Sequence, residues 1–220
     1  MEAARMPGPG GVGAREADVA PAPDPTGGRA AGLWAPADPG PLGLAGFAMT
    51  TFVLSMMNGN LVSAKGIGAV LALAFAYGGL AQLLAGMWEF RTGNTFGAVA
   101  FTSYGAFWIS FFFLLKIVPA GLVTPHAVSL YLWGWGIFTT YMFIASLRTT
   151  GAIALVFALL AATYILLAIG DMGSGHTTIT HIGGYVGIAT AVAAWYASFA
   201  AVLNSTFARI LLPVVPLRRV

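Results

Sequence analysis

The feature that most constrains this chain is a series of six apolar segments, each about as long as one crossing of a lipid bilayer. A membrane-spanning helix needs about 20 mostly apolar residues, and only 8% of this chain is charged, with 58% hydrophobic. A soluble domain carries about 25% charged residues. The sequence therefore predicts an all-α membrane protein, a bundle of six transmembrane helices. The predicted spans are Leu42–Val62, Gly66–Trp88, Phe96–Val118, Val128–Leu147, Ala152–Gly170 and Ile179–Leu203.

The first 37 residues differ in composition from the rest of the chain. They are rich in Pro, Gly and Ala, hold no apolar run, and carry three arginines and four acidic residues. A secretory signal needs an apolar core of about 7–15 residues, so we interpret residues 1–37 as a disordered cytoplasmic tail. A solvated tail is the simpler interpretation and a regulatory segment is the alternative. Residues 38–213 then form the six-helix domain, and residues 214–220 form a short basic end.

The distribution of Lys and Arg predicts the orientation in the membrane. Six arginines fall on the side of the two termini and two lysines on the other side, and short cytoplasmic loops are enriched in these residues. Both termini are therefore expected in the cytoplasm, with the chain in the plasma membrane. The excess of Arg over Lys, with much Ala and Gly, favours a bacterial source. The charges counted are Arg29, Arg91, Arg148, Arg209, Arg218 and Arg219 against Lys65 and Lys116.

Small residues predict how the spans pack. Gly183, Gly187 and Ala191 recur every four residues on the sixth span and make a face for close helix contact. Such a face fits a compact bundle with lateral contacts, and hence an oligomer. Lipid and further copies of the chain are the expected partners. The chain has no cysteine, which excludes a disulfide and a thiolate metal site, and nothing in the sequence predicts a cofactor or a nucleic-acid partner.

Polar side chains inside the spans are the first candidates for a functional site, because they are costly in a membrane. For a single Ser or Thr the simpler role is a hydrogen bond to its own preceding helical turn. Three consecutive hydroxyls at mid-span, Thr102, Ser103 and Tyr104, cannot share one helix face, so at least one is expected at a neighbouring helix or a wet path. The candidates along such a path are Thr50, Asn58, Gln82, Thr102 and Ser103.

Every lysine and arginine lies at the end of a span or outside the spans. A fixed cation at mid-depth is the expected clamp for tight binding of a carboxylate. Without one, an anion in this bundle would be held by hydroxyls, amides and backbone N–H groups, which suits weak binding and fast passage. The alternative is that a neutral acid, or the acid together with a proton, crosses.

Glu89, Asp171 and His181 are the titratable candidates for proton coupling. For Glu89 an ion pair with Arg91 at the membrane surface is the simpler expectation, and for His181 a structural hydrogen bond. His176 and His181 are five residues apart, whereas a helical zinc pair needs a spacing of four, so no metal site is predicted.

An intramembrane hydrolase would require a Ser–His set or paired carboxylates with an oxyanion hole. Glu89 and Asp171 fall in loops on opposite sides of the membrane, and Ser103 lies at mid-span, far from the histidines at the head of the sixth span. No catalytic set assembles, so the sequence predicts that the protein is not an enzyme.

Two motifs resemble a known family. Residues 38–47 read DPGPLGLAGF and resemble the opening signature Asn-Pro-x-Pro-Leu-Gly-Leu of the acetate uptake transporter (succinate–acetate permease) family, with Asp38 in place of Asn. Residues 78–108, GGLAQLLAGMWEFRTGNTFGAVAFTSYGAFW, resemble the same family almost without gaps, and LLAIG at residues 166–170 with the later His181 is similar too. The prolines stop the tail from continuing into the helix, and Asp38 retains the capping oxygen that Asn would supply.

The resemblance implies a six-helix, hexameric protein selective for acetate and, in some members, succinate. It also implies a pore in each protomer with a hydrophobic constriction. By motif, Phe47 in GLAGF, Tyr104 in FTSYG and Leu160, counted back from LLAIG, would form that constriction. Ala194, thirteen residues after His181, matches a position linked to substrate size.

The resemblance therefore predicts a plasma-membrane protein for acetate and other small carboxylates such as succinate, working as a channel or a proton-coupled permease. Two alternatives stay open. The solute is ammonium or another monocarboxylate, or the chain is a membrane sensor or scaffold that works through its tail.

Overall fold

The computed structural model describes residue 34, residues 36–173 and residues 176–217 of the 220. Most of the predicted disordered tail, and the basic end at Arg218 and Arg219, lie outside the described residues. The described helices are α1 (Gly40–Asn58), η1 (Ala64–Gly66), α2 (Ile67–Phe75), η2 (Ala76–Ala81), α3 (Gln82–Thr92), α4 (Thr95–Lys116), η3 (Ala120–Leu122), α5 (Pro125–Ser146), α6 (Gly151–Gly170) and α7 (Thr177–Thr206).

Six helical segments in the described part of the chain are long and apolar enough to cross a membrane, and one of them, from Ala64 to Thr92, is made of η1, α2, η2 and α3. This confirms the predicted all-α class with six candidate transmembrane helices. The first span ends at Asn58 rather than Val62, because the backbone of Gly59 closes the last turn and Asn60 takes a left-handed conformation. The last span reaches Thr206 rather than Leu203.

Local sequence signals explain several helix boundaries. The Asn94 side chain accepts a hydrogen bond from Gly97 N at 3.1 Å at the start of α4. Thr124 and Thr150 do the same for α5 and α6, as Asn and Thr commonly do at this position. Gly93 separates α3 from α4 with a φ of +78°, which glycine adopts without steric cost. The sequence therefore fixes these junctions locally.

The second span is not one regular helix, as the sequence predicted, but two α-helices joined by the π-helical segment η2. Here η2 lies close to both α1 and α4: an ideal Cβ on Gly46 of α1 would lie 2.7 Å from the carbonyl oxygen of Tyr77. An ideal Cβ on Gly78 would meet Thr50 and Trp108 within 3 Å. A π segment widens the helix locally, and three neighbouring elements meet at this point.

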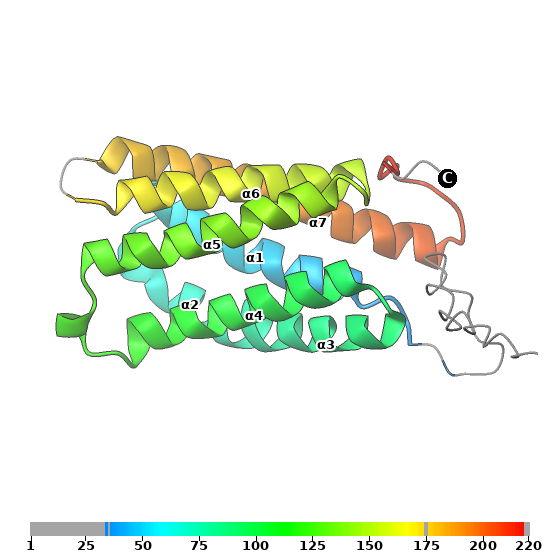
Figure 1. Ribbon diagram of the computed structural model, residues 1–220, viewed down its shortest axis with the longest axis horizontal. Coiled ribbons are helices and arrows are strands. Elements are labelled where there is room, and N and C mark those ends of the chain that lie inside the picture. Colours follow the sequence, from blue (N-terminus) through cyan, green and yellow to red (C-terminus); the bar gives the residue numbers. More distant parts are fainter. Residues whose placement is uncertain (1–33, 35, 174–175, 218–220) are drawn as a thin grey trace, which may run out of the picture. The chain divides into compact units, whose positions relative to one another are not determined.

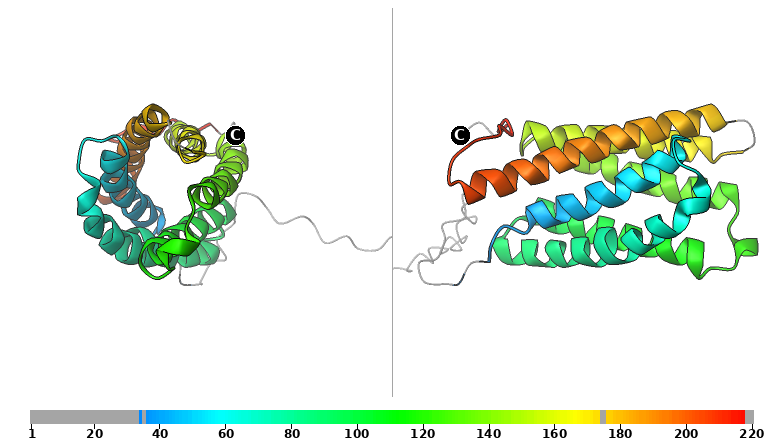
Figure 2. Two further views of the ribbon diagram at one scale, coloured as in Figure 1. Left: turned by 90° about the vertical axis from the view of Figure 1, so that its left-hand side faces the viewer. Right: turned by 180° about the vertical axis from the view of Figure 1, so that it is seen from behind.

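The helices surround a central axis, as the end-on view in Figure 2 shows. The closest packing is between α1 and α7, between α6 and α7, between α5 and α6, and between α3 and α4. The start of α1 and the end of α7 lie at the same end of the bundle (Figure 1). We call this the proximal end and the opposite one, where α1 ends and α7 begins, the distal end.

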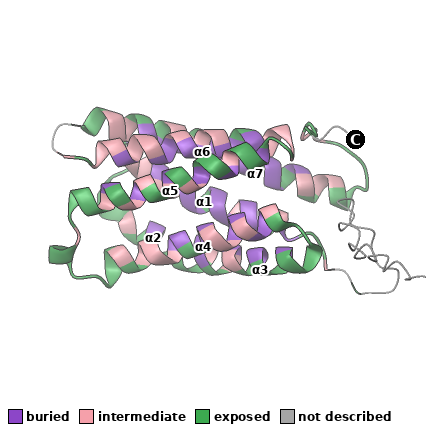
Figure 3. Cartoon of the chain, in the orientation of Figure 1, coloured by how far each residue is buried: buried purple, intermediate pink, exposed green. Residues whose placement is uncertain are grey.

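The small-residue face predicted on the sixth span is used inside the chain. Gly183 lies against Leu167 of α6, Gly184 against Gly59 at the end of α1, and Gly187 against Ser55 of α1. The face therefore joins α7 to α1 and α6 within the chain. Figure 3 shows buried residues on the inner sides of the helices and exposed ones on the outside. Large apolar side chains on that outside include Leu84, Ile137 and Phe199.

The segment after α7 folds back against the start of α6. Val215 and Val214 accept hydrogen bonds from Gly151 N and Ala152 N at 2.7 and 3.2 Å. The Asn204 side chain accepts from Leu211 N at 2.7 Å and donates to the Leu212 carbonyl at 2.8 Å. The free N–H groups that begin α6 are thus satisfied by backbone of the same chain.

Candidate functional site

A cavity of about 140 Å³ occupies the distal half of the bundle. On α1 its lining recurs at Phe47, Thr51 and Ser55, the four-residue spacing of one helix face. Facing helices contribute aromatic and aliphatic groups, with Asp171 in the lining just beyond the end of α6. Other lining residues include Asn58, Trp108, Tyr131, Leu160, Thr163, Tyr164 and Thr180.

A second cavity, of about 380 Å³, lies in the proximal half. It is framed by the starts of α1, α4 and α6 and closed in part by Val214 of the segment after α7. Its lining combines apolar groups such as Leu44, Phe101 and Phe157 with polar ones. The polar lining residues are Asp38, Glu89, Asn94, Thr149 and Thr150.

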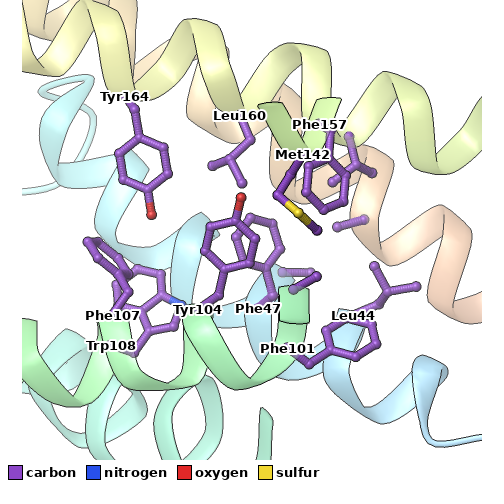
Figure 4. Close-up of a cluster of buried hydrophobic side chains, with 14 of the residues drawn as sticks. Leu44, Phe47, Phe101, Tyr104, Phe107, Trp108, Met142, Phe157, Leu160 and Tyr164 are labelled. Carbon is purple, nitrogen blue, oxygen red and sulfur yellow. The ribbon is translucent and has the colours of Figure 1, made fainter. Parts of the chain in front are cut away.

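An apolar layer separates the two cavities. Phe47 and Leu160 line the distal cavity, whereas Phe101 and Phe157 line the proximal one. Tyr104 lies between them, with its ring centroid 5.8 Å from that of Phe47 and 6.1 Å from that of Phe157. Figure 4 shows the side chains of Phe47, Tyr104 and Leu160 pointing toward one another. Each is less than 5% exposed, so the layer is closed in this conformation.

The position of Tyr104 is fixed by Thr139 of α5. The two hydroxyl oxygens are 2.9 Å apart, and the Thr139 hydroxyl also donates to the Trp135 carbonyl at 2.7 Å. Since the hydroxyl of Thr139 has one hydrogen, Tyr104 O–H is the donor between them. The sequence placed Thr139 among the polar residues of its span without assigning it a site. The sequence around a threonine does not indicate a hydrogen bond from a tyrosine 35 residues away.

The three consecutive hydroxyls point in three directions. Tyr104 enters the apolar layer, Thr102 packs against Gly86 of α3, and Ser103 lines a shallow groove on the outer surface between α4 and α5. Of the other predicted path residues, Asn58 lines the distal cavity. Thr50 lines neither of the two cavities; its hydroxyl donates to the Gly46 carbonyl at 2.8 Å.

Gln82 and Ala194 are both buried, and neither lines one of the two cavities. Gln82 begins α3 after the π segment, and its Oε1 has no hydrogen-bond partner among the described residues. Ala194 is fully buried in the same apolar cluster as Phe47 and Tyr104. Both therefore belong to the packing around the path.

Glu89 faces the proximal cavity, and its predicted ion pair with Arg91 is wrong. Its carboxylate accepts from Thr92 Oγ1 and Asn94 Nδ2 at 3.0 Å each, whereas Arg91 donates to the Trp34 carbonyl at 3.3 Å. Two residues apart on a helix, the side chains point to different faces. The Glu89 carboxylate lies at the start of α4, beside Gly97, where the positive end of the helix dipole favours a negative charge.

The other titratable candidates lie at the distal end. Asp171 caps the end of α6 and lines the mouth of the distal cavity, and burial raises the pKa of its carboxyl above the ordinary value of 3.8. His181 is half-buried in the second turn of α7 and lines neither of the two cavities. Glu89 and Asp171 thus lie in different cavities. Among the described residues no group of three His, Asp or Glu side chains is placed to hold a metal ion.

Two buried polar residues of the distal cavity were not predicted from the sequence. Thr51 and Trp108 each have a polar atom without a hydrogen-bond partner among the described residues. Both sit in ordinary apolar surroundings in the sequence, where a threonine is expected to bond its own helix and a tryptophan to mark the membrane interface.

Together, the six apolar helices and the two cavities separated by a closed layer define a membrane protein with a candidate path along its axis. A family model described as the GPR1/FUN34/yaaH family matches residues 34–219. The chain belongs to this family, the acetate uptake transporters, and so is a multi-pass membrane transporter or channel rather than an enzyme.

Relatives and a solved structure agree with this assignment. The chain is 41% identical over 181 residues to the succinate-acetate/proton symporter SatP of Escherichia coli, covering 81% of this chain and 95% of that protein. The structure of the bacterial acetate channel SatP matches with a TM-score of 0.76 at 40% identity, over 81% of this chain and 99% of that one.

The fungal relatives are longer than this chain. It covers 65% of acetate permease A from Emericella nidulans, at 42% identity over 81% of this chain. It covers 61% of the ammonia transport outward protein 2 of Saccharomyces cerevisiae, at 39% identity over 76% of this chain. The names of these relatives thus include both a carboxylate and ammonia.

Proposed function

We propose that this protein carries acetate, and small carboxylates such as succinate, across the plasma membrane along the axis of its own six-helix bundle. The distal cavity receives the solute, the layer of Phe47, Tyr104 and Leu160 controls its passage, and the proximal cavity releases it. The observation that carries the proposal is the alignment of two cavities on either side of one closed apolar layer.

The chemistry of the layer favours a small solute that is partly apolar. A hydrated inorganic ion would lose its water shell at Phe47 and Leu160 without gaining ligands, whereas the methyl group of acetate tolerates apolar contact. The described spans carry no Lys or Arg at mid-depth, so the carboxylate is held weakly by neutral donors. Weak binding at several places is what rapid conduction requires.

The orientation and assembly are part of the same proposal. Arg91 and Arg148 lie at the proximal end and Lys65 at the distal end, and this distribution supports a cytoplasmic location for the proximal end and both termini. The apolar outer surface, including Leu84, Ile137 and Phe199, lies against lipid and neighbouring copies in a hexamer. Glu89, Asp171 and His181 are the groups available for proton coupling.

The test is labelled acetate entry into liposomes that hold the purified protein, with and without an imposed pH gradient. Empty liposomes are subtracted, because the neutral acid crosses lipid unaided. Acetate accumulation against its own gradient, driven by pH, identifies a proton-coupled permease. Entry that only follows the acetate gradient identifies a channel. No protein-dependent acetate entry overturns the proposal.

Ammonium transport is the second candidate, favoured by the name of the yeast relative. The same liposomes, loaded with a pH-sensitive dye, report entry of methylammonium. Competition by methylammonium against acetate, or uptake of methylammonium alone, would favour this candidate over the carboxylate.

A sensor or scaffold that works through residues 1–37 would be favoured if removing them abolished a cellular phenotype and left flux unchanged.

A further inference from the structure

Thr51 and Trp108 are buried side chains that can form hydrogen bonds but have no hydrogen-bond partner among the described residues. Thr51 is 5% exposed and Trp108 2% exposed, and both line the distal cavity. Neither Thr51 Oγ1 nor Trp108 Nε1 has a hydrogen-bond partner among the described residues. Buried polar side chains are nearly always paired, so both atoms require an explanation.

Thr51 differs from most threonines of the spans, and among the described residues only Thr102 shares its buried, unpartnered hydroxyl. Each of five membrane-embedded threonines donates to the carbonyl four residues earlier on its own helix, at 2.7 to 2.8 Å. This bond satisfies the hydroxyl at no cost to packing. The hydroxyl of Thr51 makes no such bond. The five that do are Thr50, Thr139, Thr140, Thr163 and Thr190.

Trp108 comes from the opposite wall of the cavity and brings a group that can only donate. Its ring packs edge-on against Phe107 and Phe111, with centroids 5.0 and 5.9 Å away. Figure 4 places it beside Tyr104 and Phe47, at the apolar layer. An indole in this setting normally has a partner for its N–H.

Gly78 brings the two residues to the same level of the bundle. An ideal Cβ on Gly78 would lie 2.5 Å from Oγ1 of Thr50, the neighbour of Thr51, and 2.9 Å from Cδ1 of Trp108, the carbon bonded to Nε1. α1 and the indole of Trp108 therefore meet at this glycine through Thr50, one residue before Thr51. The two unpaired groups flank the distal side of the layer formed with Phe47 and Leu160.

We infer that Thr51 and Trp108 together bind the carboxylate group of the transported solute immediately before the apolar layer. A carboxylate is an acceptor with two oxygens, and it complements two neutral donors without a fixed cation. The methyl group then points toward Phe47 and Leu160. An ammonium ion cannot be bound by the Trp108 N–H, because that group accepts no hydrogen bond. The inference rests on the proposed function, and it names the residues that select the anionic end of the substrate.

The first test uses the unmodified protein. The indole N–H resonances of isotope-labelled tryptophan are followed during acetate titration, and the Trp108 signal is assigned from its loss in Trp108→Phe. Acetate is expected to shift the Trp108 signal and to leave that of Trp88, which is 48% exposed on α3, in place. A Trp108 signal that stays fixed while acetate is transported overturns the inference.

The second test measures transport by Thr51→Val, which keeps the shape of the side chain, and by Trp108→Phe, which keeps an aromatic ring and removes the N–H group. Trp108→Phe and Thr51→Val each remove one hydrogen bond to a charged group, which is expected to raise the acetate concentration for half-maximal entry about tenfold. Thr140→Val and Trp88→Phe are the matched controls, since both residues are exposed on the outside of the bundle. Unchanged half-maximal concentrations in both cavity variants, with elution and unfolding like the wild type, contradict the inference.

The proposed function and the carboxylate site are contradicted by different results. If the wild-type protein moves no acetate, the proposed function is wrong and the Trp108 site falls with it. If it moves acetate but neither variant alters the half-maximal concentration and the indole signal does not move, only the carboxylate site is wrong.

Discussion

At the scale of single residues, two substitutions at Tyr104 distinguish a role in packing from a role in gating. Tyr104→Phe keeps the ring and loses the O–H bond to Thr139, which keeps its own bond to Trp135, so we expect a stability loss of about 1 kcal/mol and nearly normal selectivity. Tyr104→Ala opens the layer and is expected to cost about 3–5 kcal/mol and to raise succinate entry relative to acetate. Both are measured by thermal unfolding and liposome flux. A folded Tyr104→Ala protein with an unchanged succinate-to-acetate ratio would remove Tyr104 from the gate.

Asp171 is expected to make stability and acetate entry depend on pH. Burial raises the pKa of this carboxyl above 3.8, so its negative charge costs stability as pH rises from 3.8 through the raised pKa, and costs none below 3.8. The same charge at the distal mouth repels an incoming carboxylate. Asp171→Asn is therefore expected to raise acetate entry and the unfolding temperature at neutral pH. Both differences should fade in acid, and an equal effect at every pH would argue against the charge as the cause.

The residue scale also shows what sequence alone could supply. The motifs placed Phe47, Tyr104 and Leu160 together, and the rule that three consecutive hydroxyls diverge holds for Thr102 and Ser103. The unpaired state of Thr51 and Trp108 has no such signal, because it depends on which side chains of other helices fail to reach them. The partner of Glu89 was predicted wrongly for a similar reason: Arg91 is two residues away in sequence, the actual partners Thr92 and Asn94 are three and five away, and only the end of the helix at Gly93 decides among them.

At the scale of elements, the π segment η2 is the feature that sequence periodicity could not predict. The second span is apolar on all sides, so its hydropathy does not register a change of helical period. The cause lies in neighbours: Gly46 and Gly78 allow α1, η2 and α4 to meet. The capped junctions at Asn94 and Thr150 were locally encoded, in contrast, and their helices start within one residue of the predicted spans.

Two glycines of the second span provide a matched test of this close approach. Gly78→Ala would place a Cβ 2.5 Å from Thr50 Oγ1 and 2.8 Å from Thr50 Cβ, whereas Gly68→Ala meets no atom of the described residues within 4 Å. The first is expected to lower stability by about 1–3 kcal/mol through overpacking, and the second to raise it by about 0.5–1 kcal/mol through lost backbone entropy. Thermal unfolding of the two purified variants measures the difference. Equal unfolding temperatures would mean that the contact at Gly78 relaxes without cost.

At the scale of the whole molecule, the arrangement of charge predicts which cavity faces which compartment. The even number of spans puts α1's start and α7's end on one side, and the proximal loops carry Arg91 and Arg148, with Lys65 and Lys116 at the distal end. Hydropathy alone gives six spans but no direction. A small excess of positive charge predicts the direction, and in that orientation the smaller cavity would be the entrance and the cavity with Asp38 and Glu89 the exit.

The absence of cysteine from the sequence makes this orientation directly measurable. Lys65→Cys and Arg148→Cys each introduce the one thiol of the chain, in exposed loops at opposite ends of the bundle. In intact cells a membrane-impermeant maleimide is expected to label Cys at 65 and not at 148, and permeabilised cells to label both. Reversed labelling would place the proximal cavity outside, so that Glu89 would meet the solute first and the Thr51–Trp108 pair would hold it after the apolar layer. Each of these variants removes a positive charge. The measurement is therefore repeated with the Cys at the adjacent Ala64 or Thr149 and a conservative replacement, Lys65→Arg or Arg148→Lys, so that the number of positive charges is unchanged.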